Sequence, residues 1–307
     1  MKYDISYWCV SHIGNVRRMN QDNFICDGKY MKLQEEAVSQ EEAGSQEKSE
    51  SQEEAGSQEK SESQEESESQ EESKSHEKSE PMVFPLCGVK TSKEFPLFGV
   101  FDGMGGEECG EIASCIASQN ASKMKIGKDA IEDLSGFCYK ANDAICDYAA
   151  SHDISAMGTT AAMLAFTDKE VVLCNIGDSK IFRFCNSTLE QISMDHVAIS
   201  VFGTKPPLSQ NLGIPSDELI IEPYLAHGAY HDGDIYLICS DGLTDMVSVD
   251  DITQILISKP VEKAAELLLD QALKNGGKDN ITIILCQIQS RFRRFLKRLY
   301  HTKRKEE

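Results

Sequence analysis

The sequence predicts an α+β fold in which antiparallel sheets are covered by helices. Apolar, strand-like runs dominate and often follow one another directly, as do the four runs between residues 158 and 192. Helical patterns occur in pairs, first between residues 107 and 152 and again between residues 250 and 274. A parallel sheet would instead require strands and helices to alternate one by one along the chain.

Each element has its own pattern. The helix 131–152 places one apolar stripe at helical spacing, made of Leu134, Phe137, Cys138, Ala141 and Ile145. Residues 198–229 are rich in Gly, Pro and Ser and are expected to be irregular. In chain order the expected strands are 23–27, 95–101, 158–166, 170–176, 180–185, 189–192, 234–239 and 281–289, and the expected helices are 107–122, 131–152, 250–257 and 261–274.

Composition limits the possible classes. The chain has 307 residues, 40% of them hydrophobic, which is enough for one large domain or two small ones. Its formal net charge is −20, and residues 35–80 contribute 17 Glu against only four Lys. A negative balance of this size gives no support to nucleic-acid binding.

An acidic repeat separates the first two strand-like runs, which would otherwise form a hairpin. Residues 39–50 recur unchanged at 51–62, and looser copies continue to Glu80. This sequence has almost no aromatic or β-branched residues, so it cannot bury enough surface to offset its ordering entropy. We predict that residues 33–90 are a disordered acidic Ser/Gln/Glu insertion; a single α-helix is the alternative.

Eleven cysteines are present, without any Cys-x-x-Cys pair, and most lie inside apolar runs. They are therefore expected to be buried thiols in a reducing compartment. The first residues lack the basic start and apolar block of a signal peptide, and no apolar stretch approaches 18 residues. A cytoplasmic location is the expectation.

Residues 290–307 form a basic tail with amphipathic character. Its apolar residues follow helical spacing, and they are Phe292, Phe295, Leu296, Leu299 and Tyr300. A helix of this kind, over residues 291–305, can bind an anionic membrane surface or an acidic partner, or it can pack on its own domain. The sequence leaves these three possibilities open.

Three aspartates stand at the ends of strand-like runs that are far apart in the chain. Asp102 follows the run 95–101, Asp241 comes just after the run 234–239, and Asp279 comes just before the last run. If these runs share one sheet core, the carboxylates meet at its edge. Carboxylate oxygens are the ligands that Mg²⁺ and Mn²⁺ prefer, so the pattern indicates a metal-dependent hydrolase.

A nucleotide-binding loop is the competing interpretation of the stretch that follows Asp102. A G-x-G-x-x-G motif beginning at Gly103 would need glycine at position 108, which is Glu108. Acidic side chains at Glu107 and Glu108 would also repel a pyrophosphate. We therefore set this interpretation aside.

Taken together and in order, the motifs of the chain resemble those of the metal-dependent serine/threonine protein phosphatases of type 2C. Met104, where eukaryotic members have His, matches the bacterial branch. The resemblance covers residues 1–28 and about 94–289. Its motifs are Arg17 to Asp22, Asp102-Gly103, Met157 to Thr160, Gly177-Asp178-Ser179, Asp195-His196, Asp241-Gly242 and Asp279-Asn280.

This resemblance implies a four-layer α-β-β-α sandwich of two antiparallel sheets flanked by helices, formed by residues 1–289 around the insertion. It also implies two Mn²⁺ or Mg²⁺ ions in the active site, with Asp102 as the bridging ligand. The carbonyl of Gly103 and the carboxylates of Asp241 and Asp279 would complete the inner ligands. Asp22 would act mainly through bound waters.

Two further roles come from the same resemblance. Arg17 matches the arginine that binds phosphate, for which its planar guanidinium is suited. Asp178, with Asp241, would hold a weaker third metal. Three positions depart from the usual pattern: Gln21 replaces Glu, Lys180 replaces Arg, and Met104 leaves no histidine to act as general acid.

The function implied is hydrolysis of phosphoserine and phosphothreonine by a water activated at a binuclear Mn/Mg centre, without a phospho-enzyme. The partners would be phosphorylated proteins, namely the substrates of a Ser/Thr kinase, and the chain would be a monomer. The alternative is a catalytically inactive phosphatase-like module that binds or scaffolds other proteins.

Overall fold

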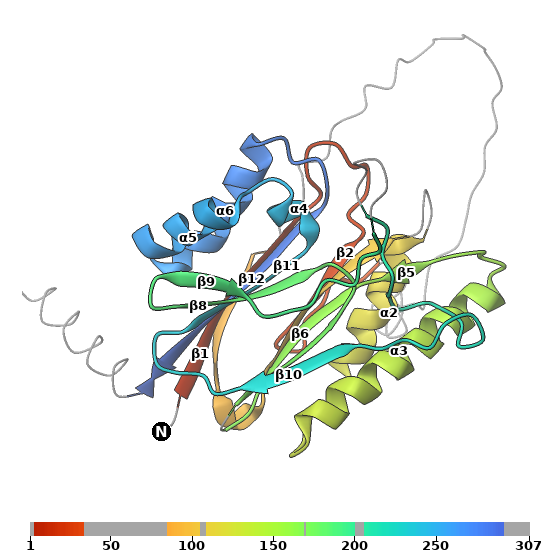
Figure 1. Cartoon of the computed structure of the whole chain (residues 1–307), viewed down its shortest axis with the longest axis horizontal. Coiled ribbons are helices and arrows are strands. Elements are labelled where there is room, and N and C mark those ends of the chain that lie inside the picture. Colours follow the sequence, from red (N-terminus) through yellow and green to blue (C-terminus); the bar gives the residue numbers. More distant parts are fainter. Residues whose placement is uncertain (1–2, 34–84, 105–108, 169, 200–205, 292–307) are drawn as a thin grey trace, which may run out of the picture. The chain divides into compact units, whose positions relative to one another are not determined.

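The computed structural model describes residues 3–33, 85–104, 109–168, 170–199 and 206–291 (Figure 1). The chain divides into two units, residues 1–31 with 81–307, and residues 32–80. All the helices and strands described belong to the first unit. None of these helices combines the length and the apolar character that a membrane span requires.

Two antiparallel sheets form the centre of this unit. In spatial order the first sheet contains β3 (Leu86–Thr91), β1 (Tyr3–His12), β12 (Ile281–Ser290), β11 (Ile235–Cys239), β8 (Lys180–Cys185) and β9 (Thr188–Gln191). The second contains β10 (Tyr224–Gly228), β7 (Val171–Ile176), β6 (Ala161–Phe166), β4 (Leu97–Met104) and β2 (Asp22–Cys26), and β5 (Gly158–Thr159) pairs with β4.

Helices cover the outer face of each sheet (Figure 1). α5 (Val249–Ser258) and α6 (Val261–Lys274) pack on the first sheet, and α2 (Gly110–Ser122) and α3 (Ala130–Ser151) pack on the second. Two short helices, η1 (Ser92–Glu94) and α4 (Asp241–Thr244), complete the set. The predicted α+β sandwich of two antiparallel sheets flanked by helices is confirmed.

Three apolar layers hold the four structural layers together. Successive side chains of a strand point to opposite faces, so on β4 Phe98 and Val100 enter the layer between the sheets while Phe101 enters the layer under α2 and α3. Aromatic rings meet between the sheets, where the centroids of Phe166 and Tyr236 are 5.5 Å apart. Burial on both faces explains why these strands read as continuous apolar runs.

Several predicted boundaries agree with the structure, whereas some of the observed elements were not predicted. The strand 180–185 and the helix 261–274 begin and end at the predicted residues. β1 was not predicted, since Asp4, Ser6 and Ser11 interrupt its apolar pattern, yet all three are buried. β10 lies in the stretch predicted to be irregular, and the short helix α4, which begins at Asp241, was not predicted.

The predicted insertion is wrong at its C-terminal end. Residues 86–90 belong to β3, which pairs with β1 from Leu86 to Thr91. β3 is an edge strand whose residues are partly buried or exposed, so its apolar pattern is weak. Residues 34–84 of the insertion and residues 292–307 of the tail lie outside the described residues.

The two sheets bring distant acidic residues to one edge. Asp22 begins β2 and pairs directly with Asp102 near the end of β4. In the first sheet β11 ends just before Asp241, and β12 begins two residues after Asp279. The topology thus gathers four aspartates that the sequence spreads over more than 250 residues.

Candidate active site

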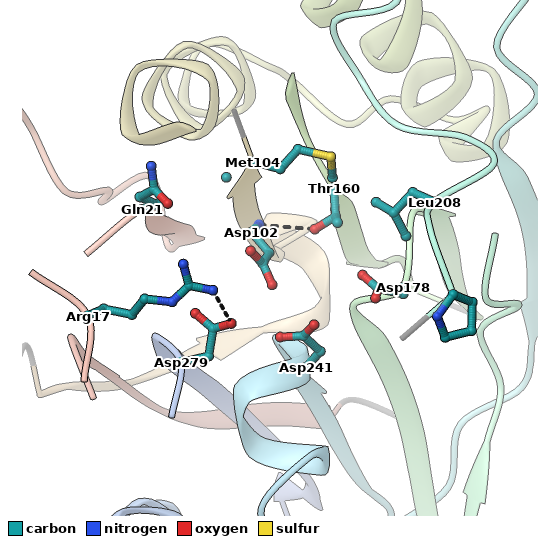
Figure 2. A pocket seen from close by; sticks show the side chains of 11 residues that line it. Arg17, Gln21, Asp102, Met104, Thr160, Asp178, Leu208, Asp241 and Asp279 are labelled. Carbon is teal, nitrogen blue, oxygen red and sulfur yellow. Dashed lines mark hydrogen bonds and ion pairs between the residues drawn. The ribbon is translucent and has the colours of Figure 1, made fainter. Parts of the chain in front are cut away.

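A cavity of about 270 Å³ opens at this edge. Six of the seven predicted site residues line it, and Asp22 is the exception. Figure 2 shows the carboxyl groups of Asp102, Asp241 and Asp279 directed toward a common space, with Asp178 facing them from the other side. The lining residues are Arg17, Gln21, Asp102, Gly103, Met104, Thr160, Asp178, Pro206, Leu208, Asp241 and Asp279.

The backbone of Asp102 is fixed by two threonines. Its N–H donates to Oγ1 of Thr160 at 3.0 Å, and its carbonyl accepts from the N–H of Thr160 at 2.9 Å and from Oγ1 of Thr159 at 3.0 Å. Oγ1 of Thr160 is in turn 2.7 Å from Oγ of buried Ser179, the residue after Asp178. This network links the turn of Asp178 to the backbone of Asp102, and sequence reasoning assigned no role to its hydroxyls.

Gly103 lies where two backbone segments meet. Its N–H donates to the carbonyl of Gln21 at 3.2 Å. A Cβ at this position would lie 2.1 Å from the carbonyl oxygen of Gly110 and 2.5 Å from that of Gln21. Only glycine allows this close approach, which brings the backbone that follows Asp102 against the Gln21 segment.

Arg17 and Asp279 form an ion pair at the mouth of the cavity. Nη2 of Arg17 donates to Oδ2 of Asp279 at 2.7 Å (Figure 2). This hydrogen bond raises the pKa of Arg17 above its ordinary value. The other oxygen of Asp279, Oδ1, accepts from the N–H of Asn280 at 2.8 Å.

Asn280 holds the loop that carries Arg17. Its Nδ2 donates to the carbonyls of Ile13 and Met19 at 2.8 and 2.9 Å, and its Oδ1 accepts from the N–H of Gln21 at 2.8 Å. One buried side chain therefore contacts both ends of this loop. The sequence motifs include Asn280 but do not assign it a role. Its position directly after the predicted ligand Asp279 is the sequence feature that could have indicated a supporting role.

Asp22 does not line the cavity and is almost completely buried, with 2% of its surface exposed. Its Oδ2 accepts from Oγ of Ser240 at 2.7 Å, and its Oδ1 has no hydrogen-bond partner among the described residues. Burial raises the pKa of Asp22 to about 7, although the hydrogen bond from Ser240 acts in the opposite direction. An uncompensated buried carboxylate oxygen suggests that a further partner binds there.

The donor set fits hydrated divalent cations. Facing carboxylates repel one another unless a cation lies between them, and the unpartnered Oδ1 of Asp22 offers an additional acceptor. In the part of the chain that the structure describes, no three His, Cys, Asp or Glu side chains are gathered closely enough to enclose a metal alone. That arrangement suits Mg²⁺-like ions, which use one or two carboxylates and retain waters, better than a closed zinc site.

The structure also shows where the three residues that depart from the expected motif pattern lie, namely Met104, Gln21 and Lys180. Met104 lines the cavity and offers no proton for transfer. Nε2 of Gln21 is 3.4 Å from Oε2 of Glu111 on α2. Nζ of Lys180 forms an ion pair with Asp195 and is 3.4 Å from the carbonyl oxygen of Asp178.

Comparisons with known proteins identify the family to which the chain is similar. The family model described as Protein phosphatase 2C matches residues 86–275, which is more than half of the chain. The chain is 30% identical over 206 residues to the serine/threonine protein phosphatase PstP of Mycobacterium tuberculosis, an alignment that covers 62% of this chain and 40% of PstP. It therefore spans well under half the length of that relative.

A second relative is matched over most of its length. The chain is 30% identical over 212 residues to the serine/threonine phosphatase stp of Listeria welshimeri, covering 62% of this chain and 84% of the relative. Among solved structures, the catalytic domain of PstP in complex with two manganese ions superposes with a TM-score of 0.64 at 23% identity. The superposition covers 94% of this chain and all of that one, which shows a common fold.

Proposed function

Because the chain belongs to the protein phosphatase 2C family, we propose that it is a metal-dependent phosphatase of phosphoserine and phosphothreonine in proteins. The family expected from the sequence motifs is confirmed. The observation that carries the proposed activity is the convergence of Arg17, Asp102, Asp241 and Asp279 on one cavity. These residues supply a phosphate-binding cation and the carboxylates that divalent metals require.

Two Mn²⁺ or Mg²⁺ ions are the proposed cofactors, supported by the two manganese ions of the PstP catalytic domain. Asp102 would bridge them, the carbonyl of Gly103 and the carboxylates of Asp241 and Asp279 would complete the protein ligands, and Asp22 would act through water. Asp178 with Asp241 would hold a weaker third ion. When bound, the ions supply positive charge for the phosphate group and lower the pKa of the attacking water.

The residues of the chain perform the remaining tasks. Arg17 binds phosphoryl oxygens through its planar guanidinium, and its ion pair with Asp279 keeps the guanidinium at the mouth of the cavity. Thr160 fixes the backbone of Asp102, so that the carboxylate needs little reorganisation. Since Met104 carries no transferable proton, the leaving alkoxide takes its proton from water or from another group.

The substrates proposed are phosphorylated proteins, as the names of the relatives suggest. Within this proposal the phosphates are introduced by a Ser/Thr kinase, and the protein acts as a cytoplasmic monomer. Residues 291–305 would contact an anionic membrane or an acidic partner, and residues 33–85 would be an insertion that catalysis does not require. Sequence composition alone supports these last two assignments.

The test is hydrolysis of para-nitrophenyl phosphate by the purified chain, with and without Mn²⁺. We expect turnover that depends on Mn²⁺ and that falls by more than about a hundredfold in Asp102→Ala and Asp241→Asn. Circular dichroism should show that both variants stay folded. Equal turnover in Asp241→Asn and the parent chain would refute the ligand assignment.

The alternative function is a phosphatase-like binding module without activity. A folded parent chain that shows no turnover with any divalent metal, yet binds a phosphopeptide, would support that alternative. Retention of Asp22, Asp102, Asp241 and Asp279 together favours the enzyme, since each of these side chains has a use in metal binding and none is needed by a scaffold.

A further inference from the structure

Ser240 occupies an unusual position for a helix-capping serine. It precedes Asp241, it is fully buried, and it stands at the N-cap of α4. A serine at this position ordinarily accepts a hydrogen bond from a backbone N–H of the first helical turn. The side chain of Ser240 forms no such cap hydrogen bond.

The hydroxyl of Ser240 instead joins three strands. It donates to Oδ2 of Asp22 at 2.7 Å and accepts from the N–H of Thr282 at 3.0 Å. The N–H of Ser240 also donates to the carbonyl of Thr282 at 3.1 Å. Because the backbone N–H of Thr282 can only donate, the proton of the Ser240 hydroxyl is left for the carboxylate of Asp22.

This contact crosses between the two sheets. Ser240 and Thr282 belong to the end of β11 and the start of β12 in the first sheet, whereas Asp22 begins β2 in the second. The bond lies at the edge where the cavity opens: Ser240 directly precedes Asp241, and Thr282 follows Asp279 by three residues in the chain. It therefore fixes one acidic side chain relative to two others that come from the opposite sheet.

Asp22 depends strongly on this hydroxyl. The carboxylate is 2% exposed, and its Oδ1 has no hydrogen-bond partner among the described residues. If Ser240 were lost, Oδ2 would lose its 2.7 Å donor in a site from which water is largely excluded. The carboxylate would then turn toward other donors, and its position relative to Asp241 would change.

We propose that Ser240 is a positioning residue of the metal centre: its hydroxyl orients Asp22 across the sheet interface and thereby sets the affinity for divalent cations. The inference rests on the proposed function, since it assumes that the cavity binds such ions. Outer hydrogen bonds of this kind typically contribute ten- to a hundredfold, on the order of magnitude, to metal affinity.

Ser11 provides a matched control. It is also fully buried, and its Oγ is 2.8 Å from Oγ1 of Thr282 and accepts from Nδ2 of Asn20 at 3.0 Å. Ser11→Ala therefore removes a buried hydroxyl from the same network without deleting a donor to any of the predicted metal ligands. We expect Ser11→Ala and Ser240→Ala to lose thermal stability to a similar extent.

The experiment measures Mn²⁺ affinity from the electron paramagnetic resonance signal of free Mn²⁺, using the full chain. We expect Ser240→Ala to raise the dissociation constant for Mn²⁺ by about ten- to a hundredfold. The dissociation constant of Ser11→Ala should stay within about threefold of that of the parent chain. In a double-mutant cycle, Asp22→Asn/Ser240→Ala should bind Mn²⁺ no more weakly than Asp22→Asn alone, because Ser240 acts through Asp22.

Three results would overturn the inference: unchanged affinity in Ser240→Ala, an equal loss in Ser11→Ala, or additive losses in the double mutant. If the folded parent chain binds no Mn²⁺, the metal site itself fails and the proposed function fails with it. If the parent chain binds Mn²⁺ and only the Ser240 effects are missing, the proposed function stands and the positioning role alone is wrong.

Discussion

Nη2 of Arg17 lies 2.7 Å from Oδ2 of Asp279, although 262 positions separate the two residues in the chain. A predicted phosphate-binding cation and a predicted metal ligand therefore contact each other directly. In the proposed function, substrate binding and metal binding would share this part of the cavity. The buried side chain of Asn280 supports both residues by holding the Arg17 loop against β12.

Replacing Arg17 by Gln should raise KM for a phosphopeptide by about ten- to a hundredfold, since hydrogen bonds to a charged group contribute about 1.5–3 kcal/mol. The neighbouring Arg18 is exposed, so Arg18→Gln removes the same charge from the same loop. Steady-state kinetics should show the large KM effect only in Arg17→Gln. Equal effects in both variants would mean that only the net charge of the loop matters.

Lys180 should stabilise the segment that forms one wall of the cavity. It pairs with Asp195, and the next residue, His196, donates its backbone N–H to the carbonyl of Gly177 at 2.9 Å. Lys180→Met leaves a partly buried carboxylate without its cation, so we expect a loss of about 1–3 kcal/mol in the free energy of unfolding.

The control for this prediction is Lys180→Arg, which keeps the charge and restores the residue usual in the family. Urea unfolding should show a smaller loss in Lys180→Arg than in Lys180→Met. Equal losses in the two variants would show that the fit of the lysine chain, and not its charge, is what stabilises the segment.

Gly242 should not tolerate a side chain. A Cβ there would lie 1.9 Å from the carbonyl oxygen of Asn280, a backbone atom that cannot move without shifting the start of β12. Gly242→Ala should therefore lower the free energy of unfolding by about 1–3 kcal/mol, as overpacking typically does. Because the clash falls beside Asp241 and Asp279, Mn²⁺ binding should weaken as well.

Gly136 is the matched position at which alanine should stabilise. It lies inside α3, and a Cβ there would meet no atom within 4 Å. Gly136→Ala should raise the free energy of unfolding by about 0.5–1 kcal/mol, because alanine loses less conformational entropy in a helix. The melting temperatures of the two variants can be compared by thermal unfolding. If Gly242→Ala and Gly136→Ala shifted the melting temperature in the same direction, the argument would be refuted.

His12 should make the protein less stable in acid. It is buried, its Nδ1 accepts from the N–H of Gly14 at 2.8 Å, and burial lowers its pKa below the ordinary value of 6.5. The unfolded chain therefore takes up the proton first as the pH falls. The stability contribution is fully present above pH 6.5 and decreases as the pH falls from 6.5 toward the pKa of the folded state.

The variant His12→Asn tests this dependence, since the amide oxygen can still accept from Gly14 but does not titrate. Urea unfolding of the metal-free protein at several pH values between 7 and 5 should show a smaller loss of stability in His12→Asn than in the parent chain. Parallel pH profiles for the two proteins would rule out a contribution from His12.

Much of the fold could be predicted because central strands are buried on both faces and therefore read as unbroken apolar runs, as β6 and β7 do. The two missed edge strands, β3 and β10, are only partly covered, so their apolar signal is weak. β1 was missed for a different reason. Its polar residues are buried, and they form hydrogen bonds and ion pairs with distant segments of the chain. The ion pair between Asp4 and Arg291 is one example.

In the candidate site, too, some residues could be predicted from local sequence, whereas others depend on contacts with distant segments. The ordered motifs identified six residues that line one cavity. Each motif, such as an aspartate at the end of a strand, can be recognised within one short segment of the sequence. Thr160, Ser240 and Asn280 act through hydrogen bonds to segments 58, 218 and 259 residues away. No local pattern encodes such contacts, so their roles became visible only once the sheets were assembled.

The pairing of β1 with β12 has a consequence for synthesis. These strands pair from Tyr3 with Ser290 to His12 with Ile281, and they lie side by side within the first sheet. A growing chain therefore carries Arg17 and Asp22 long before Asp279 and Thr282 exist to meet them. β12 completes the edge that gathers these aspartates, so a nascent chain that stops before Ile281 lacks part of the proposed site. That site can form only after β12 has emerged from the ribosome.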